Sequence, residues 1–213
     1  MIKQPTQFTY GHEGLTVMYT IPKYYKDALR ATLETLQPRK CLEIGTYAYG
    51  TAEVFQDYFS NNLHTDNQLV TCDIIPWANH PPRLVNVDFI QVYPHFPDQY
   101  MQENNYRMLA GWKSAFPQSI ELNMSLIYDV CPHQFDFIFI DADHRAVCLG
   151  KDLEMANRLK IKHVLLEDVA KEELIQESST YYHQVVKPTN IYDCYDFDDW
   201  TVLTNCALLT RRG

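Results

Sequence analysis

Asp141 is the residue whose setting in the sequence favours chemistry most strongly. It comes directly after the apolar run FIFI at 137–140, so it is expected to project from the end of a buried strand. A carboxylate in such a place is unfavourable unless it pairs with a charge or binds a metal ion. We therefore expect Asp141 to face a cleft and to act there.

A segment with two glycines, EIGTYAYG at 43–50, follows another short apolar run. The chain has only seven glycines, yet Gly45 and Gly50 both fall here. Glycine after a strand lets the backbone turn sharply and approach a ligand, because no Cβ intervenes. The spacing differs from GxGxxG, which surrounds a pyrophosphate, so this turn is less suited to phosphate. Any tight turn from strand to helix also favours glycine, and that alternative stays open.

Asp73 lies near the end of a second apolar run, QLVTCDII at 68–75. A carboxylate at this point can accept both hydroxyl hydrogens of a ribose diol, as in nucleotide-binding α/β folds. A solvated aspartate at a strand end is equally common. Taken together, Gly45 and Asp73 favour a ligand that carries adenosine and needs no phosphate.

The elements that must position these residues alternate between helical and strand periods. This alternation predicts one mostly parallel α/β sheet, because parallel strands need crossover connections. Helices are expected near 22–37, 51–59, 149–159 and 171–179, strands near 40–44, 68–75, 120–124, 135–140 and 163–166, and a closing hairpin between 196–200 and 206–210.

Residues 76–117 break this rhythm. They hold six of the eleven prolines and eight aromatic residues. A long irregular stretch inside a compact domain is usually functional, so we expect a lid or a wall of a substrate site. A packed surface excursion or a dimer contact is the alternative. The whole chain, 1–213, is expected to form one domain that carries this insertion.

Composition excludes several classes of protein. The chain of 213 residues has no apolar run near the ~20 residues that span a bilayer. Eighteen basic against 27 acidic residues give a net charge of -9, which disfavours nucleic acid as a partner. Six cysteines without a CxxC pair favour a reduced protein, and the first residues lack the apolar region of a secretory signal. We expect a cytoplasmic protein.

Two motifs carry a family resemblance. Residues 41–55, CLEIGTYAYGTAEVF, resemble the first motif of class I S-adenosylmethionine-dependent methyltransferases, especially the catechol O-methyltransferase-like branch and its sugar-methylating relatives. Residues 135–144, FDFIFIDADH, are similar to the fourth-strand motif of that group, which ends in IDADK or IDGDH. The likeness covers roughly 22–170. It implies a Rossmann-like, doubly wound, mostly parallel seven-stranded sheet whose last strand runs antiparallel.

The resemblance also implies where S-adenosylmethionine binds: the methionine part by the glycine turn, the ribose by the end of the second strand and the adenine after a weak third strand. The family often has a Gly-Asp pair at the adenine, which this sequence lacks. The implied cofactor-binding positions are Glu43, Gly45, Thr46, Tyr47, Gly50, Asp73, Ile74, Asn123, Met124, Ser125 and Asp141.

In catechol-type members of the family the residue that matches Asp141 binds Mg²⁺, with two further ligands after the fifth strand. Those positions are Glu167 and Asp168 here. Three oxygen ligands suit a hard divalent cation, which would lower the pKa of a substrate hydroxyl. His144 replaces a lysine of one branch and is the candidate general base. In metal-independent relatives Asp141 would only face the cofactor, with Glu167 and Asp168 capping a helix or lying in solvent.

The resemblance implies methylation of an oxygen atom on a small hydroxylated molecule, with S-adenosylmethionine and, as a second expectation, Mg²⁺. One alternative is an RNA 2′-O-methyltransferase, which shares the fold but would need lysines beside Asp141 and a basic track. The other is a non-catalytic nucleotide-binding or regulatory module with the same fold. A homodimer is an open expectation.

Overall fold

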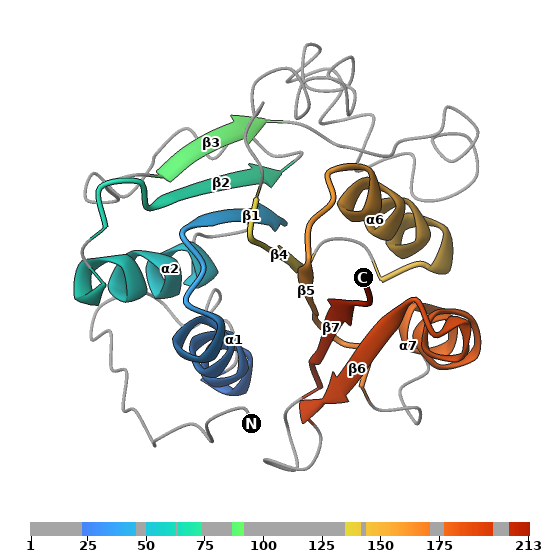
Figure 1. Ribbon diagram of the computed structural model, residues 1–213. Coiled ribbons are helices and arrows are strands. Elements are labelled where there is room, and N and C mark those ends of the chain that lie inside the picture. The colour runs from blue at the N-terminus through green and yellow to red at the C-terminus, as the bar shows by residue number, and fades with distance from the viewer. Residues whose placement is uncertain are drawn as a thin grey trace, which may run out of the picture.

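The computed structural model describes residues 23–45, 50–62, 64–73, 87–91, 135–141, 144–170, 177–197 and 205–213. Helices and strands alternate along the first part of this chain and a hairpin ends it (Figure 1). The elements are α1 (Lys23–Leu36), β1 (Lys40–Ile44), α2 (Gly50–Asn61), β2 (Gln68–Asp73), β3 (Val87–Gln91), β4 (Phe137–Ile140), α6 (Ala146–Arg158), β5 (His163–Leu166), α7 (Glu177–Tyr181), the π-helix η2 (Tyr182–Val186), the 3₁₀-helix η3 (Lys187–Thr189), β6 (Tyr192–Asp196) and β7 (Ala207–Arg211).

The strands form one seven-stranded sheet in the order β3-β2-β1-β4-β5-β7-β6. The pairs from β3 to β5 are parallel, and β7 runs antiparallel to both of its neighbours. The predicted fold class is thereby confirmed: a mostly parallel seven-stranded sheet with an antiparallel last strand. The chain order reverses between β1 and β4, and open α/β sheets bind ligands at the carboxyl ends of the strands beside such a reversal.

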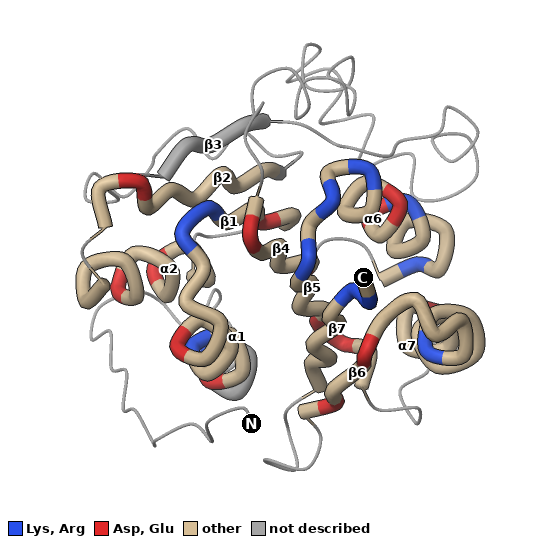
Figure 2. Tube along the Cα trace, in the orientation of Figure 1, with Lys and Arg blue, Asp and Glu red and all other residues tan. Residues whose placement is uncertain are grey.

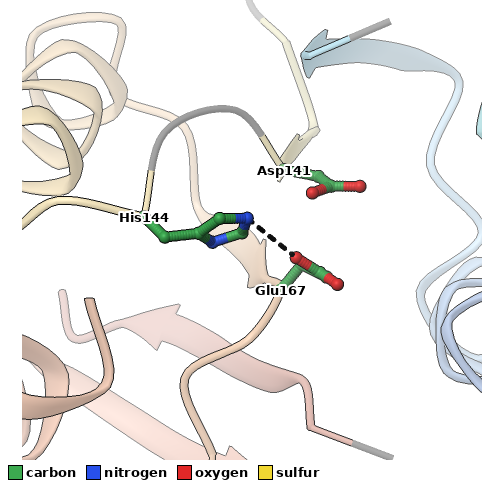
Figure 3. Close-up of side chains that lie close together, drawn as sticks. All are labelled: Asp141, His144 and Glu167. Atoms are coloured by element: carbon green, nitrogen blue, oxygen red, sulfur yellow. Dashed lines mark ion pairs between the residues drawn. The ribbon is translucent and has the colours of Figure 1, made fainter. Parts of the chain in front are cut away.

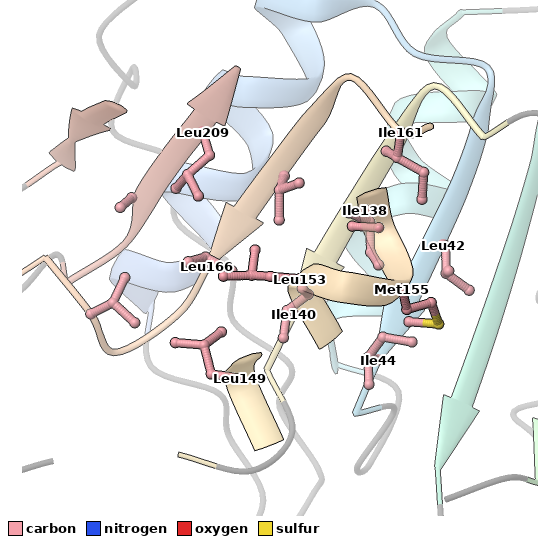
Figure 4. Close-up of a cluster of buried hydrophobic side chains, with 14 of the residues drawn as sticks. Leu42, Ile44, Ile138, Ile140, Leu149, Leu153, Met155, Ile161, Leu166 and Leu209 are labelled. Carbon is pink, nitrogen blue, oxygen red and sulfur yellow. The ribbon is translucent and has the colours of Figure 1, made fainter. Parts of the chain in front are cut away.

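Alternating side chains of the strands separate two buried layers, one on each face of the sheet. Phe137 and Phe139 of β4 pack toward α1 and α2, in a cluster that includes Leu29 and Phe55. Ile138 and Ile140 lie on the other face with residues of α6 such as Leu153 (Figure 4). Because both faces are covered, the strands read as continuous apolar runs in the sequence.

The segment 76–117 was predicted to be irregular, and this is wrong for residues 87–91. Here β3 pairs in parallel with β2, with Leu69 opposite Val87 and Asp73 opposite Gln91. Five residues, VDFIQ, suffice for an edge strand, but the prolines around them favoured the prediction of an irregular segment. The rest of 76–117 and the strand predicted at 120–124 lie outside the described residues.

The closing hairpin is confirmed as β6 and β7, although β6 begins at Tyr192 and ends where the predicted strand begins. The polar helix predicted at 171–179 is described only from Glu177, as α7, and it continues through η2 and η3 to Thr189. No described helix has the length and apolar character needed to cross a membrane. Cys41, Cys72, Cys148, Cys194 and Cys206 are free thiols.

Candidate active site

The carboxyl ends of β2, β1, β4 and β5 bring the predicted residues to one edge of the sheet. Backbone hydrogen bonds continue one step beyond each strand: Gly45 donates to Cys72 at 2.9 Å, Asp141 to Ile44 at 2.9 Å and Glu167 to Ile140 at 3.1 Å. Gly45, Asp141 and Glu167 therefore follow one another along the edge. Asp73 ends β2 beside them.

Gly45 has φ of 96°, a conformation that residues with a Cβ rarely adopt. Glycine is thus needed directly after β1, where a sharp turn was predicted. Gly50 is the first residue of α2. Thr46 and Tyr47 lie outside the described residues, as do Ile74, Asn123, Met124 and Ser125, so their proposed cofactor contacts stay predictions.

Glu43 is fully buried on the face of the sheet that α2 covers. Its carboxylate accepts hydrogen bonds from the hydroxyls of Thr51 in α2 and Thr71 in β2. Cys72 Sγ donates to the Glu43 carbonyl at 3.3 Å. Glu43 consequently ties β1 to α2 and to β2. Sequence reasoning missed both threonines, and the role of Glu43 at the cofactor stays a prediction.

Asp141, His144 and Glu167 form a cluster at this edge (Figure 3). One ligand atom from each lies within 4.8 Å of the other two. His144 Nε2 is 3.8 Å from Glu167 Oε2. Glu167 is buried, with 5 % of its surface exposed, whereas Asp141 and His144 are partly exposed. A substrate in solution can therefore reach two of the three side chains.

The thiol of Cys206 lies near the carboxylates of this edge. Burial raises the pKa of Cys206 well above its ordinary value, and the charges of Glu167, Asp141 and Asp168 raise it further. A concentration of carboxylates beside a buried layer favours a cation.

Asp168 stands apart from the cluster, although it was predicted to be a metal ligand with Asp141 and Glu167. It has φ of 55°, and its carboxylate accepts a hydrogen bond from Asn205 Nδ2 at 3.1 Å. The left-handed backbone and this bond direct Asp168 to the start of β7. The structure groups His144, predicted as a base, with the two remaining carboxylates instead.

Helix α7 and Asn205 brace the loop that carries Glu167. Ser178 donates its N–H to the His144 carbonyl at 2.8 Å and its hydroxyl to the Asp168 carbonyl at 3.3 Å. Ser179 donates to the Val169 carbonyl at 3.3 Å. The Asn205 carbonyl accepts the N–H groups of residues 169 and 170 at 3.0 and 3.3 Å. These positioning residues gave no signal in the sequence, since they lie far along the chain from the cluster.

The cluster fits a divalent cation. Oxygen and nitrogen ligands stand about 2.0–2.6 Å from such an ion, so ligand atoms within 4.8 Å of one another can share it. The two carboxylates suit Mg²⁺ or Mn²⁺, and the imidazole can either remain beside the ion or be a third ligand, which Mn²⁺ accepts more readily than Mg²⁺. Among the residues that the structure describes, this is the group with suitable ligands.

The fold is similar to solved methyltransferases. The S-adenosylhomocysteine-bound methyltransferase PaMTH1 of Podospora anserina matches with a TM-score of 0.52 and 12 % identity, over 91 % of this chain and 80 % of that one. A Staphylococcus aureus protein assigned as a caffeoyl-CoA O-methyltransferase matches with a TM-score of 0.52 and 15 % identity, over 92 % and 86 %. No protein-family model and no curated sequence matches. This chain thus has the fold of class I S-adenosylmethionine-dependent O-methyltransferases.

Proposed function

We propose that this protein transfers a methyl group from S-adenosylmethionine to an oxygen atom of a small hydroxylated molecule, assisted by a divalent cation. One observation carries the proposal: Gly45, the end of β2 and the Asp141-His144-Glu167 cluster lie together at the carboxyl edge, beside the reversal of strand order. The cofactor and the acceptor would meet there.

The residues of this edge fit the cofactor. Gly45 has a positive φ that residues with a Cβ rarely adopt, and the Glu43 carboxylate ties β1 to α2 beside it. Asp73, one strand away, is the candidate partner of the ribose hydroxyls. When bound, S-adenosylmethionine supplies a methyl group on a sulfonium, which an oxygen nucleophile attacks.

The cluster would prepare the acceptor. Asp141 and Glu167 are the candidate ligands of the cation, which when bound supplies Lewis acidity to an acceptor hydroxyl. His144 Nε2 is directed toward the same space, where it can take the proton of that hydroxyl. Glu167 at 3.8 Å would then stabilise the imidazolium. Alignment of acceptor and donor, rather than acid–base strength alone, would supply much of the acceleration.

Calorimetry tests the cofactor separately from the reaction. S-adenosylhomocysteine should bind with a micromolar Kd and raise Tm, whereas NAD should do neither. Gly45→Val should abolish this binding, because a β-branched side chain strains a φ of 96° directly after β1. Gly150→Ala is the control, since Gly150 lies in α6, where the nearest atom to an added Cβ is the hydroxyl oxygen at the end of the Tyr181 side chain, at 3.0 Å. Absence of S-adenosylhomocysteine binding to the wild type would disprove the proposal.

Transfer of a labelled methyl group tests the reaction. The acceptors are catechols, flavonoid-like phenols, sugars and a small-molecule extract, each with Mn²⁺, Mg²⁺ or EDTA. We expect product with one class of hydroxylated acceptor and a loss of at least tenfold with EDTA. Full activity in EDTA would remove the cation from the mechanism. Cofactor binding without product on any acceptor would favour the non-catalytic module.

His144 can be tested as a base or as a ligand. His144→Gln should lower kcat while leaving Mn²⁺ affinity, measured by electron paramagnetic resonance, within about threefold. A loss of affinity as large as that of Asp141→Asn would make His144 a third ligand instead of the base.

A further inference from the structure

The opposite edge of the sheet has a hollow that the proposed reaction does not use. It has a volume of about 980 Å³ and is lined by the turns that precede β1, β4 and β5 and by the turn before β2. These turns lie at the amino ends of the parallel strands, whereas the Asp141 cluster lies at their carboxyl ends. The hollow, called here the basic hollow, is therefore separated from the candidate active site by the length of the strands.

The basic hollow gathers positive charge. Arg39 and Lys40 line it on the side of β1, and Lys160 and Lys162 line it on the side of β5. Figure 2 shows Lys and Arg at the start of β1 and between α6 and β5. Four cations around one hollow are unusual in a chain whose net charge is -9.

Two carboxylates also line the basic hollow, but both are engaged. Asp136 Oδ2 accepts the N–H groups of Arg39 and Lys40 at 2.9 and 3.0 Å. Asp66 Oδ2 lies 3.5 Å from Arg39 Nη1. In the described part of the chain, Lys40, Lys160 and Lys162 take part in no ion pair. Three ammonium groups are thus available to a ligand.

The carboxyl ends of two helices balance only part of the positive charge of the basic hollow. Helices α1 and α6 end beside the basic hollow, and each carboxyl end carries about half a negative charge, which nearby cations stabilise. Together the two ends balance about one cation. The four cations exceed these ends and the two carboxylates combined, so the hollow keeps a net positive charge.

We propose that the basic hollow binds a small molecule that carries a chain of two or three phosphate groups. The cations stand on both sides of β4, and two strand spacings amount to about 10 Å, a distance that a chain of phosphates spans better than a single one. Lysine binds phosphate as a flexible point charge. Leu36, Pro38 and Phe135 add an apolar wall that suits an organic group on the phosphate chain.

Calorimetry with inorganic triphosphate and with ATP, each at 50 and 300 mM salt, tests the site. We expect micromolar binding that weakens at least tenfold at the higher salt. The double variant Lys160→Gln/Lys162→Gln should lose at least tenfold in affinity for both probes. Lys26→Gln/Lys151→Gln removes the same charge from α1 and α6 and is the matched control, which should bind as the wild type does.

The two probes identify what is recognised. Equal affinity for triphosphate and ATP assigns recognition to the phosphate chain, and tighter binding of ATP assigns it also to the apolar wall. Absence of binding at millimolar concentration, or equal loss in both double variants, would overturn the proposal. Tighter binding of a 20-nucleotide RNA of mixed sequence than of either probe would replace it with a nucleic-acid surface. These outcomes are independent of S-adenosylhomocysteine binding and of methyl transfer.

Discussion

Two aspartates bracket β4, and they show how differently the two edges of the sheet use the same residue type. Asp136 precedes the strand, and its carboxylate holds the backbone of Arg39 and Lys40 at the start of β1. Asp141 follows the strand and joins His144 and Glu167. The first carboxylate is satisfied by backbone N–H groups, whereas the second shares its space with another carboxylate. Asp136 at the amino edge therefore supports the fold, and we propose that Asp141 at the carboxyl edge serves a ligand.

The largest effect is expected from Asp141→Asn. It should lower kcat/KM for methyl transfer by about 10²–10³-fold, equivalent to about 3–4 kcal/mol, because a ligand of the cation is lost. The Tm of the metal-free protein should stay unchanged or rise, since removal of one carboxylate relieves repulsion from Glu167. Labelled methyl transfer and thermal unfolding measure the two quantities.

Asp136→Asn is the matched control for that experiment. It removes the same charge from the other end of the same strand, while its amide oxygen can still accept the N–H groups of residues 39 and 40. Methyl transfer should remain within twofold of the wild type. Similar losses in both variants would show that charge near β4, rather than position at the carboxyl edge, controls the reaction.

The next effect is on stability, at the amino edge. Asp136→Ala leaves the N–H groups of Arg39 and Lys40 without their acceptor and should lower the free energy of unfolding by about 1–2 kcal/mol. Urea unfolding measures this change. The activity of the folded fraction should not change. If Asp141→Ala destabilised the protein more than Asp136→Ala, the division of roles between the edges would be wrong.

The bounds of a strand could be predicted from the sequence where nearby residues delimit it. Strands β1 and β5 have the predicted bounds, because Pro38 and Gly45 delimit one apolar run and the short run HVLL forms the other. Strand β3 was missed because its five residues stand among prolines, and its pairing with β2 is not visible in the sequence. Parallel pairing depends on contacts far apart in the chain.

Part of the candidate site likewise could not be predicted from the sequence. Asp141 was predicted from its place after a buried strand, Glu167 was implied by the family resemblance, and the two do lie together. The separation of Asp168 was not predictable, since it depends on a left-handed φ and on Asn205, 37 residues further along. The threonine partners of Glu43 are eight and 28 residues from it. A candidate site residue can be recognised from its neighbours in the sequence, but its contact partners depend on how distant segments pack in the fold.

Asp168→Asn tests whether Asp168, unlike Asp141, lies outside the cation site, and its expected effect is smaller. The variant tolerates the left-handed backbone and keeps an oxygen that accepts from Asn205 Nδ2, so kcat/KM should fall less than tenfold. Mn²⁺ affinity should fall less than threefold. A loss equal to that of Asp141→Asn would restore Asp168 as a ligand, as the family resemblance implied, and would mean that the loop after β5 rearranges when the cation binds.

The smallest effect concerns His163, which lines the basic hollow with its Nδ1 3.1 Å from Thr210 Oγ1. Burial lowers the pKa of His163 below 6.5, the charge of Lys162 lowers it further, and Asp136 opposes them. Below pH 6.5 the unfolded chain therefore takes up a proton that the folded chain resists, so stability falls as the pH falls through this range. His163→Gln should make unfolding less dependent on pH between 7 and 5, and NMR of the imidazole should give a pKa below 6.5.

Triphosphate should raise the pKa of His163, because an anion in the basic hollow favours the imidazolium. A pKa that triphosphate leaves unchanged would place the anion elsewhere, and the amino edge would then serve the fold alone.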